Sequence, residues 1–168
     1  IKIIISDKNL GFAGGNNLGF KHCEGEFIVL LNNDTTVDKD WLKNLIYCIS
    51  ADKDIGMAQS LVLTEGIPCK YYKKNGTVNL LGHNIMEIFE IGKAGLGEIF
   101  LACGCSLIIR RSLADQLNGL FLDEYFAYSE DTYLCFKVKF RGLKIYHTSK
   151  SIVHHKGGGT SGNRKASH

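Results

Sequence analysis

The sequence has little proline and no long apolar run. Pro68 is its single proline, where 168 residues of average composition would include about eight. No apolar stretch approaches the roughly 18–20 residues that a membrane-spanning helix needs. There is no Cys-x-x-Cys pair and no block of lysines and arginines. These absences argue against a membrane-spanning chain, a zinc site of paired cysteines and a nucleic-acid-binding protein.

Charge and composition are those of an ordinary globular protein. Lys and Arg number 20 and Asp and Glu 17, which gives a formal charge of +3. Hydrophobic residues make up 45% and charged residues 22%, close to the globular average, so disorder is not expected. A chain of 168 residues fits one domain. It opens on Ile1-Lys2-Ile3, without methionine or a signal peptide, and we expect it to be part of a longer protein.

The cysteines are scattered along the chain: Cys23, Cys48, Cys69, Cys103, Cys105 and Cys135. We expect buried, reduced thiols and therefore a reducing cytoplasm, with a zinc site or a disulfide framework as the less favoured alternatives. Cys103 and Cys105 are two positions apart in an apolar run, so they should share one face of a strand.

Hydrophobic patterning predicts an α/β fold. The expected elements of the first part are a buried strand at Ile1–Ser6, a helix opened by the glycine-rich turn Asn9–Asn17, strands at Phe27–Leu31 and Ile55–Leu63, and a helix at Lys39–Ser50. This alternation is typical of a parallel sheet covered by helices. The expected elements of the last part are a strand at Leu101–Arg111, a short helix ended by Asn118-Gly119, a helix to about Phe140 and a strand at Lys144–Tyr146. Residues Thr64–Gly97 predict irregular strands and loops.

Two segments could bind a phosphate, a metal ion or a sugar. Asn32-Asn33-Asp34 follows a strand directly, where ligands bind in open α/β sheets, and a carboxylate there suits a hard divalent cation. The alternative is an Asx-turn in which Asp34 bonds its own backbone. Asn9–Asn17 could hold a phosphate or a sugar at a helix N-terminus, or it could be only a tight turn.

Two further segments carry titratable pairs. Glu130-Asp131 opens a helix after an aromatic loop that includes Phe121, Tyr125, Phe126 and Tyr128. Carboxylates beside aromatic rings describe a general base next to a wall on which a sugar stacks, although acidic residues also stabilise the first turn of any helix. His154-His155 precedes a run of glycines and could bind a metal or a phosphate, or be ordinary surface.

Taken together and in this order, the segments resemble a family-2 glycosyltransferase with the GT-A fold, most closely its rhamnosyltransferase-type branch. The matching text is NLGFAGGNN, EGEFIVLLNNDT, DWLKNLI, IGMAQSLVL, ACGCSLIIRRS, FLDEYFAYSEDTYLCFKVKFRG and IVHHKGGGTS. It covers nearly the whole chain except Thr64–Gly97. The resemblance implies a mixed, mainly parallel sheet flanked by helices, with a domain at 1–155 and a flexible basic tail at 156–168. It also implies that the first strand–helix–strand unit, which holds the nucleobase, is missing, so we expect little activity from these residues alone.

The resemblance also implies a role for individual residues. Asp34 and His154, with His155 as the register alternative, would hold Mg²⁺ or Mn²⁺ on the donor diphosphate. Asp131 matches the base that deprotonates the acceptor hydroxyl, and Glu130 would support it. The donor-binding residues would be Asn9, Gly11, Asn16, Asn33 and Asp34.

The implied reaction is a single inverting displacement. A sugar would pass from a nucleoside-diphosphate sugar to a hydroxyl of a glycan or lipid-linked acceptor, in cell-envelope polysaccharide assembly. We expect a cytoplasmic protein, with association at the inner face of the membrane and the oligomeric state left open. The first alternative is a non-catalytic sugar- or phosphate-binding remnant. A nucleotidyltransferase is less favoured, because NLGFAGGNN contains no basic residue.

Overall fold

The computed structural model describes residues 1–64, 95–126 and 129–156 and, between 65 and 94, only the backbone of five short strands. The helices are α1 (Gly11–Phe20), α2 (Trp41–Ser50), α3 (Arg111–Gln116) and α4 (Glu130–Phe140). The longer strands are β1 (Phe27–Leu31), β2 (Thr35–Val37), β3 (Ile55–Thr64), β9 (Leu96–Ile99), β10 (Ser106–Arg110) and β11 (Lys144–His155). The short strands are β4 (Ile67–Pro68), β5 (Tyr71–Tyr72), β6 (Thr77–Val78), β7 (Asn84–Ile85) and β8 (Ile88–Phe89).

The central sheet has the strand order β1-β10-β3-β11-β2, with β4 added to β3 and β9 to β11. The α/β class and the mixed sheet are confirmed. The parallel sheet expected from the alternation of strands and helices is not formed by β1 and β3, because β10 lies between them and pairs antiparallel with both. Within the described residues only β3 and β11 pair in parallel, so the expectation of mainly parallel pairing is also wrong. Periodicity reveals which face of a strand is buried but not which strand becomes its neighbour.

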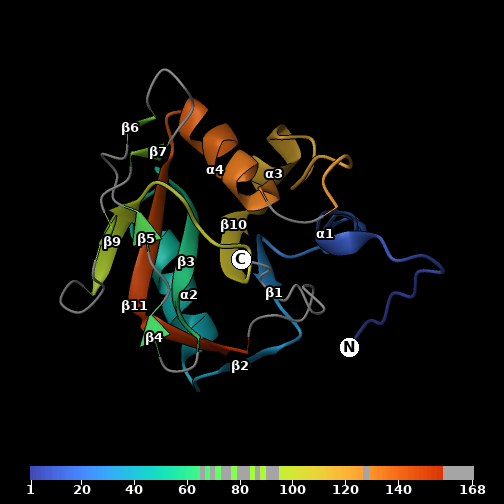
Figure 1. Ribbon diagram of the computed structural model, residues 1–168, viewed down its shortest axis with the longest axis horizontal. Helices are drawn as coiled ribbons and strands as arrows, with labels where there is room; N and C mark the ends of the chain where they lie inside the picture. The colour runs from blue at the N-terminus through green and yellow to red at the C-terminus, as the bar shows by residue number, and fades with distance from the viewer. Residues whose placement is uncertain are drawn as a thin grey trace, which may run out of the picture.

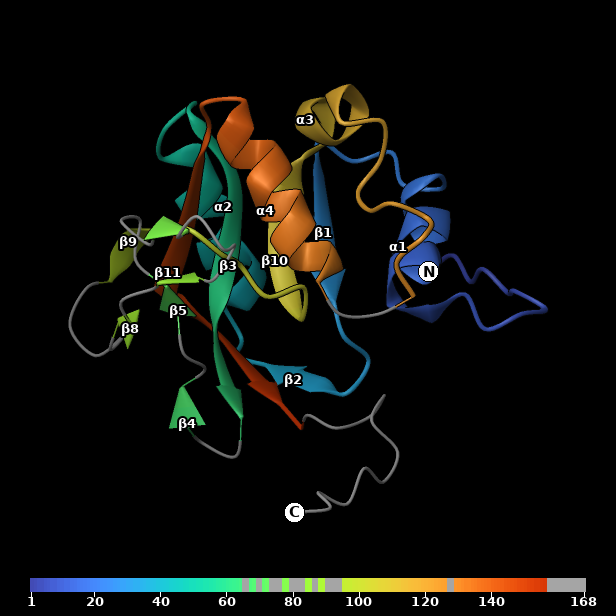
Figure 2. The same cartoon turned by 45° about the horizontal axis from the view of Figure 1, so that its top comes forward.

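Helices cover both faces of this sheet, as Figures 1 and 2 show. On one face α2 packs Leu45, Cys48 and Ile49 against β3 and β10. On the other face α1, α3 and α4 share the larger core, to which Ala13, Leu113 and Leu134 belong. Alternate residues of β3 point to the two faces, so Met57 belongs to the larger core and Ala58 to the smaller one.

The segment before α1 does not form the expected buried strand. Residues 1–6 have no regular secondary structure, and the side chains of Ile1, Ile3 and Ile5 are exposed. In both ribbon views this segment extends away from the sheet (Figures 1 and 2). A β-branched run has the propensity for a strand, but a strand also needs a neighbour to bond its backbone. None of the strand pairs in the described part of the chain includes this segment.

Two strands differ from their predicted bounds. β10 begins at Ser106 rather than Leu101, so Cys103 and Cys105 lie before the strand, the first exposed and the second buried. β11 runs to His155 rather than Tyr146, and its register with β3 shifts between Thr148 and Ile152. Asn118 and Gly119 have positive φ, as expected of a helix end.

The cysteines divide between the interior and the surface. Cys48, Cys105 and Cys135 are buried, as expected, whereas Cys23 and Cys103 are exposed. Cys69 lies outside the described residues, as do most of Thr64–Gly97 and the tail from Gly157. None of the described helices is both long and apolar enough to cross a membrane.

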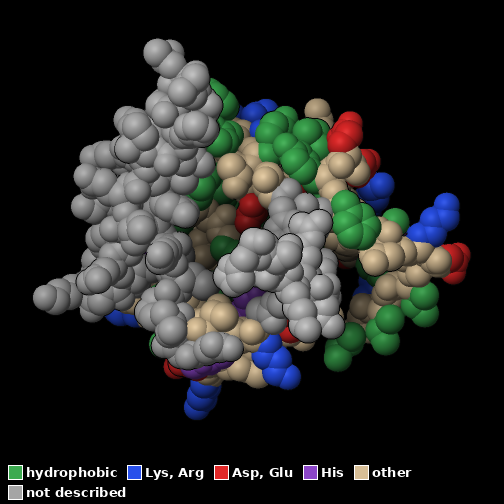
Figure 3. Space-filling view, viewed as in Figure 1, with side chains coloured by type: hydrophobic (Ala, Val, Ile, Leu, Met, Phe, Trp, Pro, Cys, Tyr) green, Lys and Arg blue, Asp and Glu red, His purple; other side chains and the backbone are tan. Residues whose placement is uncertain are grey.

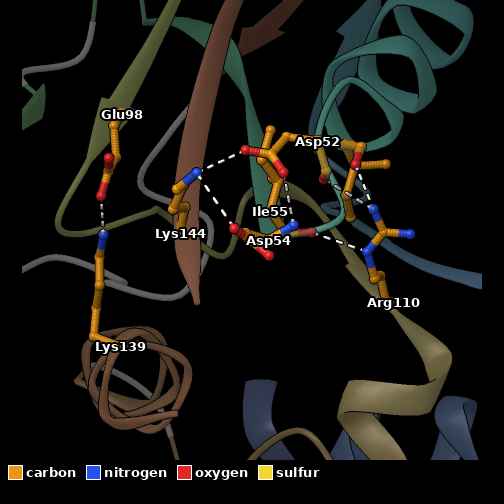
Figure 4. Close-up of polar contacts among 8 residues, drawn as sticks. Asp52, Asp54, Ile55, Glu98, Arg110, Lys139 and Lys144 are labelled. Carbon is orange, nitrogen blue, oxygen red and sulfur yellow. Dashed lines mark hydrogen bonds and ion pairs between the residues drawn. The ribbon is translucent and has the colours of Figure 1, made fainter. Parts of the chain in front are cut away.

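Polar contacts tie the elements together at one end of the sheet (Figure 4). The Arg110 guanidinium donates to the carbonyl of Ile49 at 2.7 Å and to that of Ile55 at 2.9 Å, so it holds the end of α2 against the start of β3. Lys144 pairs with Asp52 at 2.6 Å, and this contact raises the pKa of Lys144 and lowers that of Asp52. These contacts lie at the beginning of β3 and β11, and the candidate site lies at their other end.

Candidate functional site

The Asn32–Asp34 turn leaves β1 and enters β2 under several backbone constraints. The Asn32 N–H donates to the Cys105 carbonyl at 3.0 Å, just before β10. The Thr35 hydroxyl donates to the Asn32 carbonyl at 2.6 Å and closes the turn. The Lys156 N–H donates to the Asp34 carbonyl at 3.0 Å. These bonds use backbone groups and the Thr35 hydroxyl, and the Asp34 carboxylate faces the C-terminal end of β11.

The antiparallel register of β2 and β11 decides which histidine meets Asp34. Thr35 pairs with His155, and the His155 Nε2 lies 3.1 Å from the Asp34 Oδ1. The neighbouring His154 lies on the other side of the strand, where its Nε2 is 3.3 Å from the Asp38 Oδ1. The expected partner of Asp34 was His154, and the structure instead gives this contact to the register alternative, His155.

Asp34 and His155 line a cavity of about 540 Å³, which lies in the range of ligand-binding pockets. Its lining residues are Asn33, Asp34, Thr35, Thr36, Leu63, His154, His155 and Lys156. A carboxylate oxygen and an imidazole nitrogen suit Mn²⁺ or Mg²⁺ as part of a coordination sphere. No group of three or more His, Cys, Asp and Glu side chains gathers among the described residues, so phosphate and water would have to complete the sphere.

Asp131 lies in the first turn of α4 and is partly buried. Its Oδ2 accepts the Gly104 N–H at 3.2 Å, and its Oδ1 accepts the Thr132 N–H at 2.7 Å. Ser129 is the residue that precedes α4. Its φ is 70°, so the chain enters the helix from a left-handed backbone conformation. The carboxylate is therefore oriented by backbone donors from two segments of the chain.

Glu130 differs from its neighbour in being buried. Its side chain is 6% exposed, and its Oε2 has no hydrogen-bond partner within the described residues. Burial raises the pKa of this carboxyl, and the nearby Asp131 charge adds to the effect. Two adjacent carboxyl groups thus have different environments, which is a common arrangement where one of them acts as a base.

The expected aromatic wall is only partly formed. Phe121 is buried in the core, whereas Phe126 is 55% exposed. The rings of Tyr125 and Tyr133 are tilted against each other, with their centres 6.0 Å apart. Tyr128 lies outside the described residues. Figure 3 shows an acidic side chain near the middle of one face of the molecule, with histidine side chains below it, the lower ones near the edge of the view.

The glycine-rich loop forms the start of α1. The Asn9 Oδ1 accepts the Gly11 N–H at 3.0 Å, and the Asn16 amide donates to the Phe12 carbonyl at 2.8 Å within the helix. Gly11 has φ +66°, and a Cβ at this position would lie 2.3 Å from the Phe126 carbonyl oxygen. Asn9 and Gly11 line a second cavity beside α1, and Asn16 is not among its lining residues.

Three residues, Asn17, Gly104 and Cys105, connect these parts through contacts that the sequence analysis did not predict. Asn17 bonds both the N–H and the carbonyl of Phe121, at 3.1 and 2.9 Å, and so fixes α1 to the loop before α4. Cys105 and its neighbour Gly104 bond Asn32 and Asp131 respectively, so one short segment touches both candidate sites. The Asn-Asn and Cys-Gly-Cys sequences were visible, but their partners are far away in the chain.

The chain is similar in sequence to a known protein family and to a curated protein. The model of the family "Glycosyl transferase family 2" matches residues 1–117. The low-salt glycan biosynthesis hexosyltransferase Agl10 of Haloferax volcanii is 23% identical over 150 residues, which are 86% of this chain and 48% of that protein.

Two solved structures share the fold. The structure of GalNAc-T7 with UDP, GalNAc and Mn²⁺ has a TM-score of 0.73 at 17% identity, over 90% of this chain and 31% of that one. The mannosyltransferase PcManGT from Pyrobaculum calidifontis, in complex with GDP-Man and Mn²⁺, has a TM-score of 0.58 at 13% identity, over 90% of this chain and 38% of that one. The chain thus spans about half the length of the curated relative and about a third of each of these structures. Because the family model covers most of its length, the chain belongs to glycosyl transferase family 2, and its fold is of the GT-A type.

Proposed function

We propose that this chain carries the catalytic site of a metal-dependent, inverting glycosyltransferase. Its donor would be a nucleoside-diphosphate sugar, and its acceptor a hydroxyl of a glycan or lipid-linked glycan. The observation that carries the proposal is the Asp34–His155 pair, which lines a cavity. The segment Gly104-Cys105 connects this pair to Asp131, because it bonds both the Asn32–Asp34 turn and the Asp131 carboxylate. The complexes of GalNAc-T7 with UDP and Mn²⁺ and of PcManGT with GDP-Man and Mn²⁺ support it, as does the glycan-biosynthesis name of Agl10.

Asp34 and His155 would hold Mn²⁺ or Mg²⁺ through Oδ1 and Nε2. A bound divalent ion neutralises charge that develops on the leaving diphosphate. Asn33 and Lys156 line the same cavity, and an amide and an ammonium there suit diphosphate oxygens. Asn9 and Gly11, at the second cavity, and Asn16 are proposed as donor contacts.

Asp131 would act as the general base. Its carboxylate takes the proton of the acceptor hydroxyl while that oxygen attacks the anomeric carbon, and the nucleoside diphosphate leaves from the opposite face. The result is one displacement with inversion. Burial raises the pKa of the neighbouring Glu130 carboxyl. A positioned base typically contributes about 10²–10⁴-fold to the rate.

Calorimetry with Mn²⁺ in the presence of UDP or GDP tests the donor site. Asp34→Ala and His155→Ala should each weaken Mn²⁺–diphosphate binding by roughly tenfold or more, because each removes a ligand. His154→Ala is the matched control, since it removes the adjacent imidazole, which pairs with Asp38 instead. Equal losses in the two histidine variants, or no loss in Asp34→Ala, would contradict the proposed site.

Turnover separates an enzyme from a non-catalytic binding remnant. Release of nucleoside diphosphate from UDP-hexoses, GDP-mannose and dTDP-rhamnose is measured for the full-length protein and its Asp131→Asn variant. The proposal predicts a rate about 10²–10⁴-fold lower in Asp131→Asn, with Mn²⁺–diphosphate binding retained. Function that is unaffected by Asp131→Asn would favour the binding remnant.

A further inference from the structure

The segment between β9 and β10 is held by side chains from two other elements. Three consecutive N–H groups each donate to a side chain: Ala102 to Cys135 Sγ at 3.2 Å, Cys103 to Gln59 Oε1 at 3.0 Å, and Gly104 to Asp131 Oδ2 at 3.2 Å. Asp131 and Cys135 are four residues apart and lie on one face of α4. The remaining acceptor, Gln59, comes from β3. The backbone of this segment is therefore clamped between a helix and the central sheet.

The same segment contacts both halves of the candidate site. Its Gly104 N–H reaches the Asp131 carboxylate, and its Cys105 carbonyl accepts the Asn32 N–H at the beginning of the metal-binding turn. Displacement of the segment would therefore move the donor that orients the base. Gly104 has no room for a side chain, because a Cβ there would lie 2.8 Å from the Phe12 ring.

A glutamine at position 59 is unfavourable for the stability of the fold. It is completely buried, yet only its Oε1 is used, because its Nε2 has no hydrogen-bond partner within the described part of the chain. A buried polar group without a partner destabilises the folded state, and an apolar side chain of similar size would avoid this cost. The stability of the fold therefore does not explain a glutamine here.

We propose that Gln59 is a positioning residue, which holds the Ala102–Cys105 segment so that the Gly104 N–H orients the Asp131 carboxylate. This inference rests on the proposed role of Asp131 as the base. Gln59 acts through the backbone of Cys103 and Gly104. Its effect should consequently fall on the reaction step more than on donor binding, since a small misplacement of a catalytic group lowers the rate strongly.

The test compares Gln59→Met with Ser60→Ala. Methionine is close to glutamine in size but has no strong acceptor, so Gln59→Met removes the bond to Cys103 and the unpartnered amide together. Ser60 is the next residue of β3, equally buried, and its side chain points to the opposite face, where it accepts the Trp41 Nε1–H at 3.0 Å. It is a control for the loss of a buried polar group in the same strand. Gln59→Leu is a second variant in case Gln59→Met fails to fold.

Four quantities are measured on the full-length protein: Tm, amide hydrogen exchange at Gly104, and kcat and KM with the donors above. Gln59→Met should lower Tm less than Ser60→Ala does, speed exchange at Gly104, and lower kcat by about ten- to a hundredfold with KM for the donor near its wild-type value. Ser60→Ala should lower Tm but leave Gly104 exchange and kcat nearly unchanged.

The proposal is overturned if Gly104 exchange is the same in Gln59→Met and wild type. It is also overturned if kcat falls in proportion to Tm in both variants, because that pattern belongs to a purely structural residue. If the wild-type protein transfers sugar from none of the donors, the proposed function fails instead. Faster Gly104 exchange in Gln59→Met would then still show that Gln59 holds the segment.

Discussion

At the scale of single residues, the two neighbouring carboxyl groups of α4 show how environment assigns different roles. Asp131 is partly buried and accepts N–H groups from Gly104 and Thr132. Glu130 is buried and its Oε2 has no partner among the described residues, so its neutral form is favoured. Sequence adjacency alone would suggest two equivalent acids.

Replacement of Glu130 by glutamine should make stability less dependent on pH. The raised pKa of Glu130 means that the folded state holds this proton more tightly than the unfolded state does. Its contribution is therefore fully present at low pH and is lost as pH rises above about 4.3, the ordinary glutamic acid pKa. At pH 7 Glu130→Gln should raise the free energy of unfolding, and this gain should shrink as the pH is lowered to 4. Urea denaturation at both pH values measures this.

The matched control is Glu124→Gln, which changes an exposed glutamate in the loop before α4. It should leave the free energy of unfolding nearly the same at both pH values. A stabilisation by Glu130→Gln that is as large at pH 4 as at pH 7 would contradict a raised pKa of the Glu130 carboxyl.

At the scale of elements, the position of α1 depends both on a glycine that allows close contact with the loop before α4 and on an asparagine that bonds this loop. The Phe12 N–H donates to the Phe126 carbonyl at 2.8 Å, and Gly11 lies directly against the same oxygen. Asn17 adds two bonds to Phe121 one and a half turns later. The loop before α4 is thus fixed to α1, and with it the approach to Asp131.

Two glycines of α1 should respond in opposite ways to alanine. Gly11→Ala introduces a Cβ 2.3 Å from the Phe126 oxygen at a residue with φ +66°, so it should destabilise the protein by about 1–3 kcal/mol. A Cβ at Gly15 would meet nothing within 4 Å, so Gly15→Ala should stabilise by about 0.5–1 kcal/mol through helix propensity. Urea denaturation measures both. Stabilisation by Gly11→Ala would show that α1 does not pack against the loop in this way.

At the scale of the whole molecule, the sheet is covered by helices on both faces but the N-terminal segment is not covered. Ile3 and Ile5 are 80% and 86% exposed, and the segment has no strand neighbour within the described residues. Exposed apolar side chains on an unpaired extended backbone favour association between molecules.

Two lysines in this segment should therefore reduce self-association of the chain without loss of stability. We expect Ile3→Lys with Ile5→Lys to change the free energy of unfolding by less than about 0.5 kcal/mol, as is usual for exposed sites. Sedimentation equilibrium over a range of concentrations should show less association than in the wild type. Ser112→Lys controls for added charge at an exposed site elsewhere. A large loss of stability in the double variant would mean that this segment packs against the fold.

Much of the local structure could be predicted from the sequence. β1 has the bounds expected from the apolar run Phe27–Leu31, and the glycine-rich turn does open a helix. The Asn118-Gly119 helix end was likewise visible in the residues. These features depend on neighbours within a few positions, so periodicity and turn chemistry are enough to find them.

The candidate site could be predicted only in part. Asp34 and Asp131 were identified through the order of the motifs that resemble the family, because each carboxylate alone could also be explained by an Asx-turn or by the first turn of a helix. The choice between His154 and His155 could not be made, since it depends on the register of β2 and β11 and on the shift of β11 against β3. Gln59 could not be found at all, because nothing nearby in the chain distinguishes it from an ordinary buried strand residue.

The sequence by itself thus determined the α/β class and most of the helices and strands, which follow from local pattern and residue chemistry, and the motifs of the family resemblance pointed to Asp34 and Asp131. Only the tertiary structure decided that β10 separates β1 from β3, that Ile1–Ser6 is exposed, and that Gly104 bonds Asp131. The physical reason is that strand pairing and backbone–side-chain bonds join residues far apart in the chain. Which strand or side chain becomes the partner depends on the other partners that the whole fold brings close, and a local sequence pattern does not predict this.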